Sequence, residues 1–309
     1  MQRRAAVIVF LSALALIARG QFNLSDPAFV GQQGGQQGSY VWDADATNWL
    51  NGQGIVATAN GADVNSRVST NVNRLVLDAK TNGWWAKCDI IYPFIQPYGA
   101  WPGTTNNLRY QAFTSNAFNP TIGGTVTTNA NGIVFAGAGY LKSGYQPLAS
   151  KTVVGMSPTN VHIFAYITEG TTSSKWFVGG NNNATDYLGI QVLSGNGFYG
   201  YPLSSASGIV LPVNLQSVIG GVVLTRTNND SGMWFQGTNS AAGVATSTNT
   251  AYTTADIYVG GRSYGNAPLS YFTGTIAGFT VGASIPTNVV ATFLADWIRY
   301  ETGMGRRGW

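Results

Sequence analysis

The strongest constraint on the fold is a series of short β-like runs between Gly132 and Gly282, separated by turn residues. Strand-forming residues dominate the runs, which start roughly ten residues apart, and this spacing is typical of an all-β sandwich. We therefore predict a mainly β fold in which two antiparallel sheets pack face to face. The runs are GIVFAGAGYLKSG, VHIFAYITEG, KWFVGG, YLGIQVL, GFYGYP, SVIGGVVLTRT, GMWFQG, DIYVGG and YFTGTIAGFTVG.

Two details of these runs support the strand prediction. In VHIFAYITEG, the side chains of Ile163, Ala165 and Ile167 would form one apolar face of an extended segment. The stretch from Asn228 to Gly232 separates LTRT from MWFQ, and its Asn, Asp and Gly residues predict a hairpin turn. Glycine within many of the runs predicts curved strands with bulges.

A helical region precedes the β-like runs. Asp43 or Asp45 can cap a short helix that ends near Gly52. A longer helix follows, and then a third helical turn over WWAKCDIIY. These segments predict a small helical subdomain over residues 43–95.

The longer helix and a terminal helix each carry one apolar stripe at helical spacing. Asn82-Gly83 is a stop signal for the first. The terminal helix is predicted to begin at Pro286-Thr287 and to end at Gly303. The stripes are Val68, Val72, Leu75 and Ala79 in the first helix, and Val290, Phe293, Leu294, Trp297 and Ile298 in the second.

The N-terminal segments differ in composition from the rest. Residues 1–20 begin with MQRR, continue with an apolar run of about 14 residues and predict a secretory signal peptide. An uncleaved membrane anchor is the alternative, but this run is shorter than the ~20 residues that span a bilayer. Residues 21–42 contain GQQGGQQGS and predict a flexible Gln/Gly-rich linker. Residues 96–309 then hold the β domain and terminal helix, with early strands around Leu108–Phe113.

The charge of the chain gives no support for nucleic-acid binding. Charged residues make up 9% of the chain, against roughly 25% of an average soluble domain. The formal charge of +4 includes Arg3, Arg4 and Arg19 of the predicted signal peptide, and without them it falls to +1. Nucleic-acid binding needs a clustered positive face, and we assign the basic pair Arg306-Arg307 to a solvated tail.

Several motifs resemble those of one fold family. Gly132 to Leu141 resembles the FxGxGxYL strand pair that opens the concanavalin A-like, or laminin-G-like, jelly roll. Ile257 to Gly261 and Phe272 to Ile276 resemble its closing hairpin. Val72 to Phe94 resembles a helical unit that precedes such jelly rolls in uncharacterised bacterial and phage tail-associated proteins. The resemblance spans roughly residues 43–305.

This resemblance implies a two-sheet antiparallel jelly roll with a small N-terminal helical subdomain and a C-terminal helix. It implies no single activity, because the fold hosts lectins, glycanases, lyases and structural modules. The predicted secretory signal departs from typical phage tail proteins and favours a secreted or cell-envelope protein.

The acidic residues argue against an enzyme. Retaining glycosidases place two carboxylates about 5 Å apart. The chain has only two glutamates, Glu169 and Glu301, which are far apart in sequence and have no acidic neighbours at strand spacing. Cys88 lies in an apolar run and is interpreted as a buried small hydrophobe. A nucleophilic cysteine would need a histidine partner, and no pattern in the sequence places His162, the one histidine, beside it.

No cofactor is predicted. Asp186 and Asp230 lie in loops and Asp256 opens a strand-like run; turn capping explains these acids at least as well as a calcium site does, so Ca²⁺ stays an unsupported alternative. One cysteine and one histidine do not make a zinc site.

Exposed aromatic rings beside amides are the remaining functional signal, because sugar C–H faces stack on rings while sugar hydroxyls need hydrogen-bond partners. A role in the core or at its rim is the alternative for each residue. The candidates in loop-like settings, with two polar neighbours, are Trp101, Trp176, Tyr187, Tyr201, Arg262, Tyr264 and Asn266.

We therefore predict a secreted, non-catalytic binding or adhesion module that recognises a glycan or a cell-surface polysaccharide. Its expected partners include neither nucleic acid nor, after signal cleavage, a spanned membrane, and a homo-oligomer stays open. The first alternative is a phage-derived structural or tail-fibre module. The second is a polysaccharide-cleaving enzyme, against which the acidic residues argue.

Overall fold

A computed structural model describes residues 41–55, 64–95, 107–109, 118–147, 156–170, 175–183, 186–193, 197–204, 208–212, 218–237, 240–246 and 253–306. The predicted signal peptide, nearly all of the predicted linker, Trp101 and most of the segment Leu108–Phe113 lie outside these residues. Residues 43–309 form one compact unit, and its described part is mainly β, as predicted.

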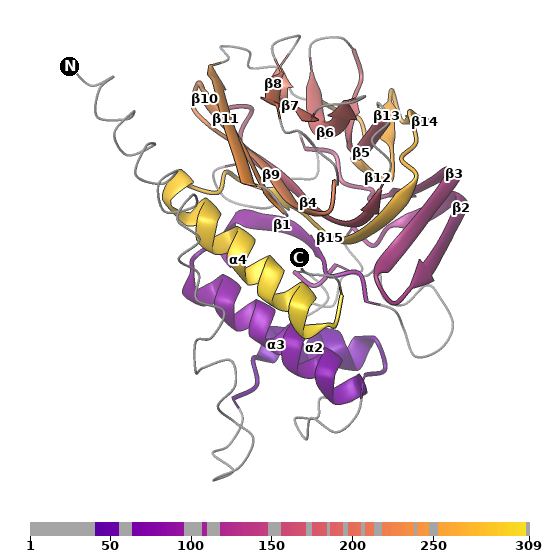
Figure 1. The fold of residues 1–309 in the computed structure, drawn as a ribbon, viewed down its shortest axis with the longest axis vertical. Helices are drawn as coiled ribbons and strands as arrows, with labels where there is room; N and C mark the ends of the chain where they lie inside the picture. Colours follow the sequence, from indigo (N-terminus) through magenta and orange to yellow (C-terminus); the bar gives the residue numbers. More distant parts are fainter. Residues whose placement is uncertain are drawn as a thin grey trace, which may run out of the picture. The chain divides into compact units, whose positions relative to one another are not determined.

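Helices lie at the beginning and at the end of the described chain, and the strands lie between them (Figure 1). The helices are α2 (Ala44–Gly52), α3 (Val64–Thr81), the 3₁₀ turn η1 (Trp85–Lys87) and α4 (Thr287–Gly303). The strands are β1 (Cys88–Tyr92), β2 (Thr121–Asn129), β3 (Gly132–Lys142), β4 (Asn160–Gly170), β5 (Lys175–Asn181), β6 (Tyr187–Leu193), β7 (Gly197–Ser204), β8 (Ile209–Pro212), β9 (Gly220–Thr227), β10 (Asp230–Gly237), β11 (Ser240–Thr246), β12 (Tyr258–Val259), β13 (Arg262–Tyr264), β14 (Ala267–Leu269) and β15 (Gly274–Gly282).

Within the described residues, all of these strands belong to one hydrogen-bonded sheet. Its main path runs β11-β10-β9-β4-β15-β3-β12-β5-β6-β7-β8. The strand β15 joins the two halves of this path, because it pairs with β4 on one edge and with β3 on the other. The sheet is therefore continuous, and the prediction of two separate sheets is not confirmed.

The two halves of the sheet face each other across one core. Phe177 of β5 packs against Phe198 of β7 at 5.7 Å between ring centroids, and Phe198 packs against Phe235 of β10 at 5.0 Å. At the far ends of the path, β8 and β11 approach without pairing: a Cβ at Gly243 would lie 2.9 Å from Leu211. The sheet thus closes nearly on itself around apolar side chains.

The strand β4 is buried on both faces. Ile163, Ala165 and Ile167 lie in the core between the sheet halves, which confirms the predicted apolar face. Phe164 points the other way, where its ring lies 4.9 Å from that of Phe293 in α4. The hairpin turn predicted after LTRT is also present, because β9 pairs in antiparallel register with β10.

The helices follow their sequence signals closely. Asp43 caps α2 by accepting a hydrogen bond from the Asp45 backbone N–H, and α2 ends at Gly52 as predicted. The predicted stripe of α3 is buried, and α3 lies alongside α4 (Figure 1). In α4 the predicted stripe is buried except for Ile298, which is partly exposed.

The third predicted helical turn is shorter than expected. Only Trp85–Lys87 is helical, and Cys88–Tyr92 is the strand β1, which pairs with β15. Two features explain the difference: the run CDIIY contains β-branched and aromatic residues, and β15 has a free edge beyond its short pairing with β3. The predicted helical region thus contributes a strand to the main sheet.

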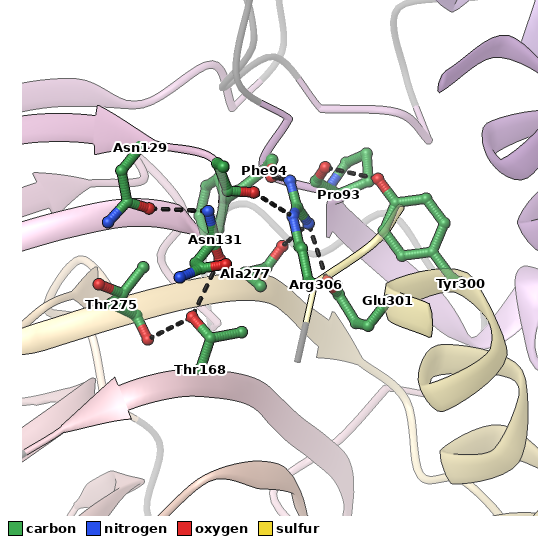
Figure 2. A network of polar contacts seen from close by, with 11 residues as sticks. Pro93, Phe94, Asn129, Asn131, Thr168, Thr275, Ala277, Tyr300, Glu301 and Arg306 are labelled. Carbon is green, nitrogen blue, oxygen red and sulfur yellow. Dashed lines mark hydrogen bonds and ion pairs between the residues drawn. The ribbon is translucent and has the colours of Figure 1, made fainter. Parts of the chain in front are cut away.

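Arg306 does not belong to a solvated tail, as the sequence suggested, but is buried (Figure 2). Its Nη1 lies 2.9 Å from Oε2 of Glu301, which is also buried. The guanidinium further donates to the backbone carbonyls of Phe94, Ala130 and Ala277. These carbonyls and Glu301 explain the burial, because they supply acceptors for a charge that would otherwise be costly to desolvate. Arg307 lies outside the described residues.

Candidate functional site

The outer face of β5, β6 and β7 carries the candidate site. Tyr201 pairs with Gly189, and Gly189 pairs with Gly179, so these three positions point to the same side of the sheet. The neighbouring residues Leu188 and Ile190 point into the core. Side chains on the Tyr201 side therefore face away from the core.

Four aromatic residues gather on this outer face, together with one arginine. We call Trp176, Tyr187, Tyr199, Tyr201 and Arg262 the aromatic platform. The ring of Trp176 lies 4.9 Å from that of Tyr201 and 5.8 Å from that of Tyr187, in both cases at an interplanar angle of 18°. Tyr187 and Tyr201 are 5.0 Å apart at 32°, and Tyr199 adds a fourth ring 4.6 Å from Tyr201.

Trp176 forms the floor of the platform. A Cβ at Gly189 would lie 2.9 Å from its ring, and a Cβ at Gly179 would lie 3.1 Å from it. The ring therefore occupies space that side chains at these two glycines would need, and only 4% of Trp176 is exposed. Tyr187 and Tyr201 are partly exposed and present the accessible ring surface.

Arg262 is brought to the platform by β13, which pairs in parallel with the end of β5. Its guanidinium carbon lies 4.9 Å from the centroid of Trp176 and 5.4 Å from that of Tyr187, within the range of cation–π attraction. Burial, reinforced by Tyr199 and Tyr187 and opposed by Arg262, raises the pKa of Tyr201 to about 12. Tyr201 is thus a neutral phenol at neutral pH, able both to donate and to accept a hydrogen bond.

The hairpin of β13 and β14 holds the remaining described candidates. Tyr264 is exposed near its tip. Asn266 stabilises the hairpin: its Oδ1 accepts a hydrogen bond from the Asp256 backbone N–H at 2.8 Å, and its carbonyl accepts one from the Tyr258 hydroxyl at 2.8 Å. Asn266 therefore holds the segment that positions Arg262.

The structure thus brings together Trp176, Tyr187, Tyr201 and Arg262 among the sequence candidates, while Tyr264 and Asn266 lie on the adjoining hairpin. The three aromatic members lie on strands rather than in the loops that we expected. Tyr199 was missed by the sequence analysis. The alternation of Tyr199 and Tyr201 in GFYGYP could have indicated it, because residues two apart on a strand share a face.

A second, smaller cluster lies on the same face. Tyr258 pairs with Gly179 on one side and with Lys142 on the other. The rings of Tyr140 and Tyr258 stack at 4.9 Å and 2°, and Lys142 forms a 2.9 Å ion pair with Asp256. The face that carries the platform thus extends across β12 to β3.

Two of the three acids considered for calcium binding have other partners, and the third, Asp230, is exposed at the start of β10. Oδ1 of Asp186 accepts hydrogen bonds from the backbone N–H groups of Asn182 and Asn183, both at 3.0 Å, which is the predicted turn capping. Asp256 is paired with Lys142. Among the described residues, no group of three or more His, Cys, Asp or Glu side chains is placed to hold a metal ion.

Cys88 and His162 are neighbours, which no pattern in the sequence indicated. Their Sγ and Nε2 atoms lie 3.8 Å apart, and both residues are fully buried. Nδ1 of His162 lies 2.5 Å from the Ala283 carbonyl, and Nε2 lies 2.9 Å from the Thr280 hydroxyl. Burial raises the pKa of the Cys88 thiol and lowers that of His162 to about 4. The pair is therefore a neutral thiol beside a neutral imidazole, which lacks the thiolate that a nucleophile needs.

No helix in the described part of the chain is long and apolar enough to cross a membrane. No family model matches the chain, and no curated protein matches it.

Several solved structures resemble it in part. A mutant of Trypanosoma rangeli sialidase with trans-sialidase activity is 12% identical at a TM-score of 0.46, over 76% of this chain and 39% of the sialidase. Domain 4 of the arabinanase AbnA from Geobacillus stearothermophilus, in complex with arabinotriose, is 18% identical at a TM-score of 0.39, over 58% of this chain and 90% of that domain. The module CBM40 of Ruminococcus gnavus IT-sialidase, bound to α2,3-sialyllactose, is 12% identical at a TM-score of 0.35, over 43% and 82%. The chain spans about two fifths of the sialidase, and at these low scores the likenesses carry no argument about function.

Proposed function

We propose that this protein is a non-catalytic glycan-binding protein that uses the aromatic platform. One observation carries the proposal: the partly exposed rings of Tyr187 and Tyr201 stack on Trp176 on an outer face of the sheet, with the ring of Tyr199 beside that of Tyr201. Aromatic residues that only stabilise a fold are usually enclosed in its core, whereas exposed clusters mark binding surfaces.

The chemistry of the platform suits a sugar ring. The apolar C–H face of a pyranose can lie on the rings of Tyr187 and Tyr201, while their hydroxyls reach the sugar hydroxyls. Gln191 adds an amide, because it pairs with both Trp176 and Tyr199 and therefore points to the same face. The platform thus combines ring surface with neutral donors and acceptors.

The positions of the described glutamates support a role without catalysis. Glu301 is buried in its ion pair with Arg306. Glu169 accepts hydrogen bonds from the side chains of Asn131 and Thr275, on a different part of the sheet. Hydrolysis by the common two-carboxylate route needs a pair of acids across the scissile bond. Neither glutamate adjoins the platform, and the two neighbouring aspartates have other partners: backbone N–H groups for Asp186 and Lys142 for Asp256.

The proposal also includes a fold family for the sheet and a location for the protein. The two facing halves of the sheet support kinship with concanavalin A-like jelly rolls, despite their continuity through β15. The predicted signal peptide supports a glycan partner outside the cell. Sugars and polysaccharides of the cell surface or its surroundings are therefore the proposed ligands.

Binding to a glycan array, followed by titration calorimetry with the strongest hit, tests the proposal. Tyr201→Ala is expected to weaken binding about tenfold, the equivalent of about 1.4 kcal/mol. Tyr271→Ala is the matched control, since Tyr271 is also partly exposed but its ring lies 6.2 Å from that of Tyr140, outside the platform. Wild-type protein that binds no glycan, or equal losses in the two variants, would contradict the proposal.

A further inference from the structure

Arg262 is one of the described basic residues that form no ion pair. The described ion pairs engage Arg74, Lys80, Lys142, Arg299 and Arg306. Arg262 takes part in no ion pair or hydrogen bond with a described residue, and its contacts are the rings of Trp176 and Tyr187. Its Nε is buried without an acceptor in the described structure.

The neighbouring acids do not neutralise this charge. Asp186, next to Tyr187 in sequence, accepts two backbone hydrogen bonds. Asp256, at the start of the β12 segment, is held by Lys142. The platform therefore carries one positive charge whose usual partner, a carboxylate, is missing from the described side chains around it.

The guanidinium is also held in place before any ligand arrives. Two rings contact it, at 4.9 and 5.4 Å from its central carbon, and the paired backbone of β13 fixes its origin. Arginine presents donors in a planar fork that matches a carboxylate with two parallel hydrogen bonds. A preorganised fork loses less conformational freedom on binding than a mobile one does.

We propose, building on the glycan-binding function, that the ligand is an acidic glycan whose sugar carboxylate is bound by Arg262. In a uronic acid the carboxylate is attached to the pyranose ring itself. The guanidinium of Arg262 contacts the ring of Tyr187. A sugar stacked on Tyr187 can therefore place its carboxylate beside this guanidinium. One sugar residue would then contact the aromatic rings through its apolar face and Arg262 through its carboxylate.

Matched pairs of polysaccharides test the proposal without any variant. The probes are polygalacturonate, alginate and hyaluronan, each compared by calorimetry with its carboxyl-reduced, neutral form. At least one acidic polymer is expected to bind tenfold or more tightly than its reduced form, and added salt should weaken only the acidic complex. Equal affinity for both members of every pair overturns the inference and leaves the proposed function standing. Binding of no polymer, acidic or neutral, counts against both.

Variants then assign the preference to Arg262. Arg262→Gln is expected to abolish the preference, and Arg262→Lys to keep part of it, because lysine retains the charge but not the fork. Lys175→Gln is the matched control, since it removes the same charge from an exposed residue adjoining Trp176. A comparable loss of preference in Lys175→Gln would mean general charge attraction and would overturn the assignment. Thermal unfolding of each variant verifies that the fold is intact.

Discussion

Two aromatic clusters lie on outer faces of the same sheet and have opposite surroundings. One cluster, Trp84, Phe164, Phe293 and Trp297, is enclosed between α4 and the half of the sheet that contains β4, and it is fully buried. The other is the aromatic platform, on the half that contains β5 to β7, whereas the described helices lie by the first half (Figure 1). The helix α4 covers the first cluster, and no described helix covers the platform (Figure 1). Whether a helix covers the rings therefore decides whether they are buried or exposed.

The ring geometry of the two clusters differs in part. In the buried cluster, Phe293 meets Phe164 and Trp84 nearly edge-on, at 84° and 83°, although Trp84 and Trp297 are stacked at 30°. In the platform, Trp176 lies within 18° of Tyr187 and of Tyr201. Edge-on packing fills a volume from all sides, whereas nearly parallel rings on a sheet leave a broad surface. The composition agrees, because tyrosine keeps a polar group for water or a ligand.

The largest expected effect is the loss of the central ring of the buried cluster. Trp297→Ala should lower the free energy of unfolding by about 4 kcal/mol, because it leaves a cavity between α4 and β4. Trp297→Phe is the control and should cost much less, since it keeps a ring and removes an indole N–H that has no described partner. Denaturant unfolding measures both. A loss below about 1 kcal/mol for the alanine variant would contradict the buried role.

The Arg306–Glu301 pair should come next. Arg306→Met is expected to cost about 3 kcal/mol at neutral pH, because Glu301 then stays buried without a counter-charge. Burial already raises the pKa of Glu301, and Arg306 opposes that rise. When a carboxyl has a higher pKa in the folded than in the unfolded state, the protein becomes less stable as pH rises and the carboxyl ionises. The stability lost in Arg306→Met should therefore become smaller in acid, where Glu301 is protonated.

The double variant Arg306→Met, Glu301→Leu is the control for this pair. It should recover part of the lost stability, since it removes both buried charges. Denaturant unfolding across a pH series measures the deficit. A deficit that does not change with pH would contradict the assigned role of Glu301.

His162, at the edge of the buried cluster, should give a pH dependence of its own. Burial lowers its pKa from 6.5 to about 4. The unfolded chain therefore takes up the proton first, and stability should fall by roughly 2 to 3 kcal/mol as pH drops from 6.5 to 4. His162→Gln should flatten this part of the curve. An unchanged slope in that variant would assign the acid sensitivity to other groups.

The smallest effect on stability is expected at the platform. The double variant Tyr199→Ala, Tyr201→Ala should change the free energy of unfolding by less than about 1 kcal/mol, because both rings are partly exposed. Denaturant unfolding beside Trp297→Ala gives a direct comparison. A loss as large as that of Trp297→Ala would remove the contrast between the two clusters.

Much of the local structure could be predicted from the sequence. The nine predicted runs correspond to β3 to β7, β9, β10, β12 and β15, because alternation and turn residues are local signals. The strands β2, β8, β11, β13 and β14 were missed. IVLP, RSY and APL are short, and TIGGTVTTN and SAAGVAT are built largely of small or polar residues with little apolar pattern. The strand CDIIY was assigned to a helix, because its pairing with β15 is a contact over almost 200 positions that no local pattern records.

The candidate site shows the same limit. Trp176, Tyr187, Tyr201 and Arg262 could be proposed from residue type and polar neighbours. Their proximity could not, since it depends on the register of β5, β6 and β7 and on the parallel pairing of β13. The burial of Arg306 likewise depends on carbonyls from three other segments of the chain. The sequence does not show these contacts, and the charge of Arg306 alone therefore predicted exposure to solvent.

Arg306 also has a consequence for how fast the chain folds and unfolds. It bonds to Phe94, 212 positions away in sequence, and to Ala130, 176 positions away. Contacts over such separations close large loops, and their cost in chain entropy is met only when most of the structure is present. The Arg306 contacts should therefore be absent from the folding transition state, so Arg306→Met should speed unfolding and leave the folding rate almost unchanged. The contacts of Arg306 with Phe94 and Ala130 would therefore act chiefly by slowing unfolding.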